Sequence, residues 1–127
     1  MYGIYVQTTR AIDYAAALVG GYKKIETRTR DVLKNMDKSE PVAVIRTGRG
    51  HKPEIVGYVN IQPGYHCPAD LFQNFNEYHL VPPGSKYDAD ERGKWFYDIY
   101  DPVKLDVPVE LPKNRINHGR SYTEFTL

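Results

Sequence analysis

The segment GGYKKIETRTR, residues 20–30, places a single carboxylate among four cations. Glu26 follows Lys23 by three residues and precedes Arg28 by two. Such a group can bind an anion, because a guanidinium forks onto a phosphate or a base edge and a lysine adds a mobile positive charge. The carboxylate can orient both cations and accept a hydrogen bond from a base amino group. The same pattern is typical of a solvated ion pair that contributes about 0–1 kcal/mol.

A second group of basic residues lies in the segment RTGRGHK, residues 46–52. Arg46 and Arg49 stand beside glycines, which let a backbone approach a phosphate closely. A solvated hairpin loop explains the same composition, and the sequence leaves both interpretations open. Arg10, at the start of the first helical stretch, completes the cations that we include among the candidate binding residues.

The tyrosines and the single cysteine give weaker signals. Eleven tyrosines offer flat faces on which a base can stack. Tyr97 or Tyr100 can serve in this way, although aromatic strand residues are more typical of a core. Cys67 is the only cysteine, so no intramolecular disulfide forms, and no zinc-binding spacing is found. We therefore predict neither a metal nor a cofactor.

The overall charge of the chain is too small to attract nucleic acid or a membrane surface by itself. The net charge is +1, from 17 basic and 16 acidic residues, so any basic binding surface has to be local. The longest uncharged apolar run is far shorter than the roughly 20 residues of a membrane helix, and the first residues do not resemble a signal peptide. We expect one domain over residues 1–127, a cytoplasmic location and no membrane association. The sequence carries no signal for an oligomeric state.

The elements that position the first cluster begin with a short strand at residues 3–7. Thr8 or Thr9 can cap the helix predicted for residues 10–19, where apolar residues recur at helical spacing. The pair Gly20–Gly21 should end this helix, because glycine adopts the left-handed conformation without a steric penalty.

A strand is predicted next, over residues 24–28. Alternation along a strand would place Glu26 and Arg28 on one face and Thr27 on the other.

The rest of the chain predicts further short strands and one more helix. We expect a long-looped hairpin (41–46 and 54–61), a short helix (68–78), an exposed loop (79–93), two strands (94–100 and 105–111) and a strand in the tail. Pro108 should mark an edge strand or a bulge. Five to seven strands with two helices indicate an α+β fold or a small β-barrel.

The pattern Gly21-x-Lys23-x-x-Glu26-x-Arg28, preceded by a strand and a helix, resembles the signature of the ASCH domain family, which has a PUA-like fold. The segments VAVIRTGRGHKPEIVGYVNI and GKWFYDIYDPVKLDVPVEL are similar to later strands of that family. The resemblance implies an α+β fold with a small PUA-like β-barrel and two or three short helices. It also implies a cleft beside the first helix that binds RNA, another nucleic acid or a modified nucleoside. Gly21, Lys23, Glu26 and Arg28 would line that cleft.

The resemblance also implies an alternative, enzymatic function. Some relatives are amidohydrolases that remove the acetyl group from N4-acetylcytidine with a lysine, a threonine and a glutamate. The lysine would fall on Lys23, but the threonine would fall on Glu26, which has no hydroxyl nucleophile. An acid/base route with Lys23 and Glu26 stays conceivable. We expect the binding function instead, and little release of cytidine from N4-acetylcytidine.

Overall fold

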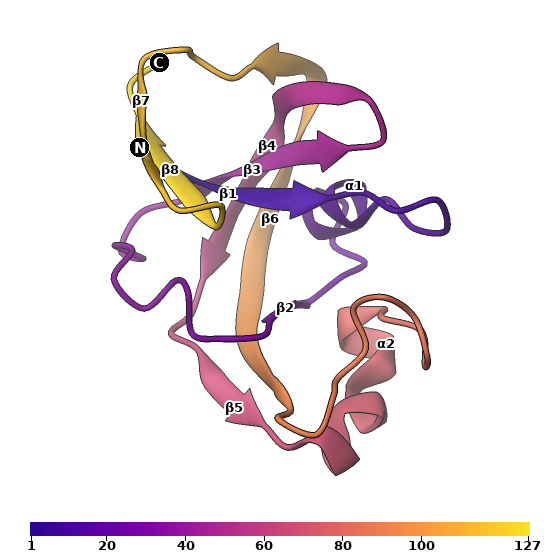
Figure 1. Cartoon of the computed structure of the whole chain (residues 1–127). Helices are drawn as coiled ribbons and strands as arrows, with labels where there is room; N and C mark the ends of the chain where they lie inside the picture. Colours follow the sequence, from indigo (N-terminus) through magenta and orange to yellow (C-terminus); the bar gives the residue numbers. More distant parts are fainter.

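The structure is a computed structural model that describes all 127 residues. Eight strands form a strongly bent sheet in the order β2-β6-β4-β3-β1-β8-β7, with β5 also paired to β6 (Figure 1). The strands are β1 (Tyr2–Gln7), β2 (Ile25–Arg28), β3 (Val42–Gly48), β4 (His51–Ile61), β5 (Tyr65–Cys67), β6 (Lys94–Glu110), β7 (Arg115–His118) and β8 (Tyr122–Phe125). The helices are α1 (Tyr14–Val19), the 3-10 helix η1 (Ala69–Phe75) and α2 (Asn76–His79).

The sheet is open. Strand β2 pairs only with β6, and β7 pairs only with β8, so the two ends of the strand order are not joined by hydrogen bonds. The predominance of sheet with two short α-helices agrees with the prediction, but the expected closed barrel is not formed. Because β2 has four residues and leads into the irregular segment 29–41, no ladder continues from it to β1.

Helix α1 packs one side against the bent sheet. Ala15, Leu18 and Val19 of the helix are buried in the larger of two hydrophobic cores. Gly57 of β4 allows this close approach, because a Cβ atom there would lie 2.6 Å from a Val19 methyl carbon and 2.2 Å from the Val103 carbonyl oxygen. The helix is therefore held firmly at the start of the segment that leads to β2.

The predicted helix boundaries need one correction. Helix α1 begins at Tyr14 and not at residue 10, and its N-cap is Asp13, whose Oδ1 accepts a hydrogen bond from the Ala16 amide at 3.0 Å. Thr9 instead closes a turn, since its hydroxyl oxygen accepts from the Ile12 amide at 3.0 Å. The predicted glycine stop is confirmed: Gly20 is the C-cap, and Gly21 has the positive φ of 82°.

The hairpin that was predicted to have a long loop has a two-residue turn. Strands β3 and β4 extend to Gly48 and His51, which pair directly. Only Arg49 (φ 52°) and Gly50 (φ 75°) form the turn, and two successive positive φ values are typical of a type I′ hairpin. The cations of the segment 46–52 are consequently spread along two strands and not gathered in a loop.

The two predicted strands at 94–100 and 105–111 form one long strand, β6. Its register with β4 shifts between Lys104 and Val109, so Pro108 lies in a bulge, as predicted. A second irregularity surrounds Asp101, which has a positive φ of 50°. The bulges let one strand bend and pair with β2 and β5 near its beginning and with β4 further on.

The remaining elements are close to expectation, with three differences. The predicted helix at 68–78 occurs as η1 followed by α2, and of its apolar residues Leu71, Phe72 and Phe75 only Phe72 is buried. The predicted exposed loop begins with the buried residues His79 and Val81. The tail forms the hairpin β7–β8 and not a single strand. Neither helix approaches the length that a membrane crossing requires.

Candidate functional site

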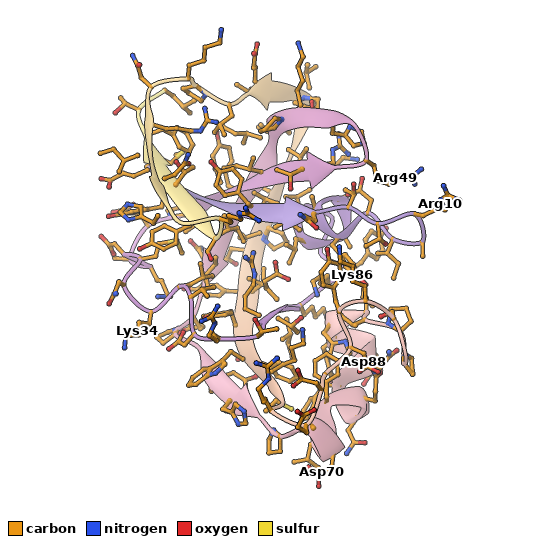
Figure 2. The ribbon with its side chains drawn as sticks, in the orientation of Figure 1. Arg10, Lys34, Arg49, Asp70, Lys86 and Asp88 are labelled. Carbon is orange, nitrogen blue, oxygen red and sulfur yellow. The ribbon has the colours of Figure 1, made fainter.

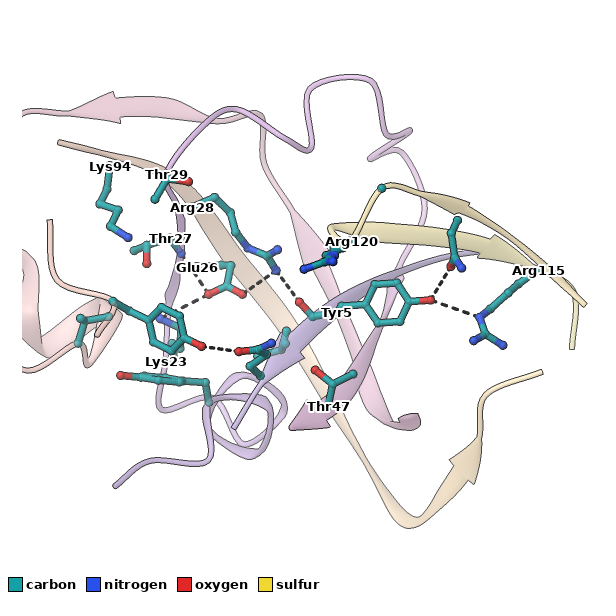
Figure 3. Close-up of a pocket in the computed structure, with 17 residues that line it drawn as sticks. Tyr5, Lys23, Glu26, Thr27, Arg28, Thr29, Thr47, Lys94, Arg115 and Arg120 are labelled. Carbon is teal, nitrogen blue, oxygen red and sulfur yellow. Dashed lines mark hydrogen bonds and ion pairs between the residues drawn. The ribbon is translucent and has the colours of Figure 1, made fainter. Parts of the chain in front are cut away.

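A pocket of about 860 Å³ lies at the gap that the open sheet leaves between β1 and β2 (Figure 3). Its walls come from five parts of the chain: β1, the segment from α1 to β2, Thr47 of β3, the loop before β6 with the first residue of β6, and the β7–β8 hairpin. The lining residues used below are Tyr5, Gln7, Tyr14, Lys23, Glu26, Thr27, Arg28, Thr29, Tyr87, Lys94, Arg115 and Arg120. The missing ladder between β1 and β2 thus creates the cavity.

Glu26 is the centre of a buried charge cluster in this pocket. Its Oε2 atom lies 3.2 Å from Arg28 Nη2, and its Oε1 atom lies 3.6 Å from Lys23 Nζ. Oε1 also accepts a hydrogen bond from the Thr27 amide at 3.1 Å. Glu26 is only 6% exposed and Lys23 only 2%. The cluster is therefore not the solvated ion pair that the sequence pattern also allowed.

The Lys23 ammonium contacts neighbouring groups on several sides. Its ammonium donates to the His79 carbonyl oxygen at 2.5 Å and stands over the Tyr14 ring, 5.1 Å from the ring centroid. His79 is itself fixed, because its Nδ1 accepts from the Val81 amide and its Nε2 therefore donates to the Phe72 carbonyl oxygen. These contacts hold Lys23 in place beside Glu26 and leave it little freedom to follow a ligand.

The protonation of the cluster follows from burial and from neighbouring charge. Burial alone would raise the pKa of Glu26, but Arg28, Lys23 and the hydrogen bond from the Thr27 amide outweigh it and hold that pKa below its ordinary value. Burial lowers the pKa of Lys23, and Glu26 opposes this effect. Glu26 is consequently an ionised group that organises cations, and not an acid poised to donate a proton.

Arg28 connects the two sides of the gap. Its Nη2 atom donates to the Tyr5 carbonyl oxygen of β1 at 2.8 Å and also contacts Glu26. The side chain is 18% exposed, and no intramolecular partner engages its other nitrogens. The guanidinium therefore spans the open seam of the sheet and presents free donors to the pocket.

Thr27 and Thr29 also line the pocket, although alternation along β2 places Thr27 on the face opposite Glu26 and Arg28. The reason is that β2 is the last strand of the sheet, so the pocket runs past its unpaired edge. The Glu26 side chain folds back to its own strand edge and accepts from the Thr27 amide there. Residues from both faces of β2 can then reach the same cavity.

The charged side chains that line the pocket are mostly positive. Five cations line the pocket, and Glu26 is the only carboxylate. Three of the five, Lys94, Arg115 and Arg120, were not predicted from the sequence. They lie some 70 to 90 residues after Glu26, in segments with no local motif, so only the pairing of distant strands brings them here.

Two tyrosines form an aromatic part of the wall. The Tyr14 and Tyr87 rings meet edge to face at 6.0 Å, and the Tyr87 hydroxyl donates to Gln7 Oε1 at 2.6 Å. The aromatic residues suggested by the sequence lie elsewhere: Tyr97 is fully buried and donates to Asp31, and Tyr100 does not line the pocket. Tyr14 is only 5% exposed and has the Lys23 ammonium over its ring, so Tyr87 is the more accessible of the two rings.

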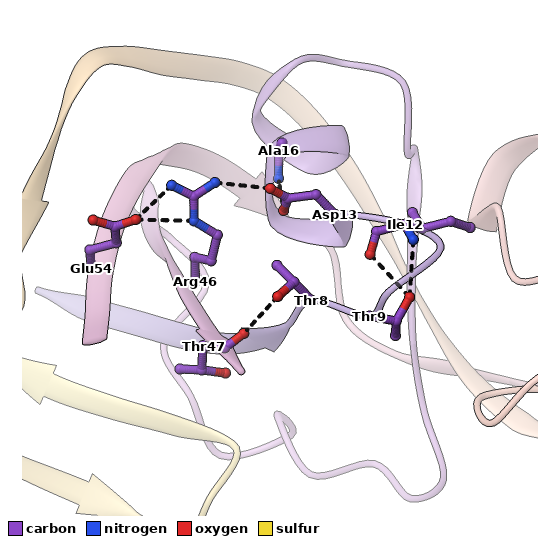
Figure 4. Close-up of polar contacts among 8 residues, drawn as sticks. All are labelled: Thr8, Thr9, Ile12, Asp13, Ala16, Arg46, Thr47 and Glu54. Carbon is purple, nitrogen blue, oxygen red and sulfur yellow. Dashed lines mark hydrogen bonds and ion pairs between the residues drawn. The ribbon is translucent and has the colours of Figure 1, made fainter. Parts of the chain in front are cut away.

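Four of the predicted binding residues lie outside the pocket. Arg46 pairs with Asp13 at 2.9 Å and with Glu54 at 2.6 Å, so its guanidinium is occupied near the N-terminus of α1 (Figure 4). Arg10 and Arg49 are exposed on separate loops (Figure 2). Gly21 contributes the left-handed turn that leads the chain from α1 toward Lys23. Of the predicted residues, the fold brings together Lys23, Glu26 and Arg28.

No group of three or more histidine, cysteine, aspartate or glutamate side chains is arranged to hold a metal ion.

Comparison with known proteins identifies the fold. No protein-family model matches the sequence, and no curated protein matches it. Crystal structures of ASCH from Zymomonas mobilis do match. A serine-to-alanine mutant of that protein has a TM-score of 0.71 at 14% identity, over 98% of this chain and 88% of the other. The unmutated protein has a TM-score of 0.69 at 16% identity, over 98% and 87%. The chain therefore has an ASCH-domain fold, in which one helix lies beside the open edge of a bent sheet.

Proposed function

We propose that the chain is a nucleic-acid-binding module, specifically an RNA-binding one, formed by a single ASCH domain with PUA-like architecture over residues 1–127. The observation that carries this proposal is the charge of the pocket beside α1. Five lining cations against one carboxylate give the cavity a formal charge of +4, although the whole chain has a charge of only +1. A cavity of this kind attracts a polyanion locally.

The dimensions of the pocket favour an unpaired nucleotide over a duplex. Its volume of about 860 Å³ is typical of small-ligand sites and is too small for a double helix. The half-buried Tyr87 ring lines the pocket, and sequence-specific RNA recognition commonly stacks unpaired bases on such rings. RNA in a single-stranded loop or at an end is therefore the partner that we propose, in the cytoplasm, where a chain with one free cysteine is suited to reducing conditions.

Titration of a short, fluorescently labelled single-stranded RNA at several salt concentrations tests this function. Affinity should fall as salt rises, because each neutralised phosphate releases condensed counterions. Arg120→Ala is the cleanest variant, since Arg120 lines the pocket, is exposed and makes no hydrogen bond or ion pair within the chain. We expect it to lower affinity about tenfold and to reduce the salt slope by about 1 without changing thermal stability.

Arg28→Ala should reduce RNA affinity further, and Arg49→Ala is the matched control because Arg49 is an exposed arginine outside the pocket. Equal losses from Arg49→Ala and Arg120→Ala would show that RNA binds the general surface. Full RNA affinity in both pocket variants would reject the proposed site.

A second candidate function is hydrolysis of N4-acetylcytidine or a related modified nucleoside. It is favoured by one observation, that the hydroxyl-bearing residues Thr27 and Thr29 line the pocket beside Lys94 and Lys23. A threonine hydroxyl needs a neighbouring base to act as a nucleophile, and no hydrogen bond joins either hydroxyl to one. We therefore rank this function second.

Incubation of the purified protein with N4-acetylcytidine separates the two functions. We expect little or no cytidine to be released. Rapid turnover that Thr27→Ala abolishes and Thr27→Ser retains would assign the enzymatic function, since serine keeps a hydroxyl. Turnover abolished by Lys23→Ala but not by Thr27→Ala would point instead to the acid/base route through Glu26.

A further inference from the structure

Lys94, the first residue of β6, has an unusual environment. It is only 5% exposed, yet it lines the pocket at the end opposite Arg115 (Figure 3). Its main chain is fixed by pairing with Cys67 of β5, and its ammonium points toward Thr27 and Glu26. The side chain is thus buried along its length, with its charged end directed into the cavity.

The ammonium of Lys94 has no partner within the chain. The nearby carboxylates are engaged elsewhere: Asp88 accepts from Gln73 and two backbone amides, and Asp90 pairs with Arg92 at 2.6 Å. Glu26 accepts from Arg28 and the Thr27 amide and faces Lys23. Every fully buried side-chain nitrogen or oxygen in the chain has a hydrogen-bond partner, so the Lys94 ammonium must reach the open space of the pocket.

Lys23 lines the same cavity, and its ammonium has partners within the chain. Its ammonium has a carbonyl oxygen, a carboxylate and an aromatic ring as neighbours. Lys94 is 5% exposed against 2% for Lys23, but its ammonium makes none of those contacts. Burial lowers the pKa of Lys94, and the charges of Asp90, Asp88 and Glu26 oppose this effect. An ammonium that opens into a pocket from a buried side chain is only partly solvated, and an oxyanion at hydrogen-bond distance would stabilise it.

We infer that Lys94 is an oxyanion-binding residue and that the occupant of the pocket carries a phosphate there, so that the pocket selects a nucleotide over the corresponding nucleoside. This inference rests on the proposed function and names the ligand group that the pocket requires. A phosphate suits the site because its oxygens can accept from the Lys94 ammonium, which lies beside Thr27 in the pocket (Figure 3). The half-buried Tyr87 ring remains available to the base.

The test compares the four ribonucleoside 5′-monophosphates with the four matching nucleosides, titrated into the protein by NMR at millimolar concentrations. We expect at least one monophosphate to bind at least tenfold more tightly than its nucleoside. Lys94→Met should lower the affinity for that monophosphate about tenfold and leave nucleoside affinity unchanged. The matched control is Lys34→Met, which removes the same charge from an exposed residue outside the pocket.

Two results would overturn the inference: equal affinity for monophosphate and nucleoside, or no binding of any monophosphate. If RNA binding still depends on Arg120 in either case, the proposed function stays intact. Full monophosphate affinity in Lys94→Met would overturn it as well. Loss of the proposed function has a different signature, namely that the unmodified protein does not bind RNA at all.

Thermal unfolding provides a readout that separates ligand binding from a structural role. Because Lys94→Met replaces an unpartnered buried charge with an apolar side chain of similar length, the melting temperature of the free protein should stay the same or rise. A fall of several degrees, with monophosphate affinity retained by the folded fraction, would make Lys94 a structural residue and overturn the inference.

Discussion

Two clusters of three charges have opposite arrangements in this molecule. In the Glu26 cluster (Lys23, Glu26 and Arg28), one carboxylate lies between two cations. In the Arg46 cluster (Asp13, Arg46 and Glu54), one guanidinium lies between two carboxylates. Both contain residues that the sequence suggests for anion binding, but only the Glu26 cluster lines the pocket.

The two clusters differ in the sign of their net charge and in whether they face the pocket. The Glu26 cluster has an excess of positive charge and faces the cavity, with Lys23 and Glu26 buried and Arg28 partly exposed. The Arg46 cluster has an excess of negative charge on partly exposed side chains, and Asp13 also caps α1. A basic residue in the sequence is therefore available to an anion only where the fold leaves it without enough carboxylates.

The largest expected effect comes from Glu26→Gln. This change leaves Lys23 buried without a counter-charge, and breaking a buried ion pair in this way typically costs about 3–5 kcal/mol. Glutamine keeps an oxygen that can accept from the Thr27 amide, so the loss measures charge and not a missing acceptor. Urea unfolding at neutral pH checks the value. A loss below about 1 kcal/mol would mean that the His79 carbonyl oxygen alone is enough to hold Lys23.

A smaller effect is expected from acid. Because the pKa of Glu26 is below its ordinary value in the folded protein, its ionised form adds stability above about pH 4.5. This stability is lost as pH falls from that value through the lowered pKa. Urea midpoints at pH 7 and below pH 4 should therefore differ less in Glu26→Gln than in the unmodified protein. An identical acid dependence in both proteins would show that other carboxylates, and not Glu26, control it.

The smallest effect is expected from Arg46→Gln. Its two ion pairs are partly exposed, and Asp13 Oδ1 still accepts from the Ala16 amide when Arg46 is removed. We expect a loss of about 1 kcal/mol in the free energy of unfolding, decreasing in high salt, and no change in RNA affinity. Reduced RNA affinity with a native-like melting curve would extend the binding surface to the Arg46 cluster and weaken the contrast between the two.

Local features of the sequence determined the core of the candidate site. The glycine pair that ends α1 and the spacing of Lys23, Glu26 and Arg28 lie within nine residues, so the turn and the short strand β2 bring these side chains together without distant contacts. The resemblance to the ASCH family rests on the same residues, and the fold comparison agrees with it. Patterns within one turn or one strand depend on backbone geometry, which residue type and spacing encode directly.

Only the tertiary structure decided which other residues share the pocket. Lys94 and Arg120 enter it because β6 pairs with β2 and because the β7–β8 hairpin pairs with β1, and neither pairing has a signature near those residues. Arg46 leaves it because Asp13 and Glu54 meet its guanidinium from two separate elements. The register of distant strands depends on how the whole apolar core packs, and a bulge or an unpaired edge redirects side chains that simple alternation would place elsewhere.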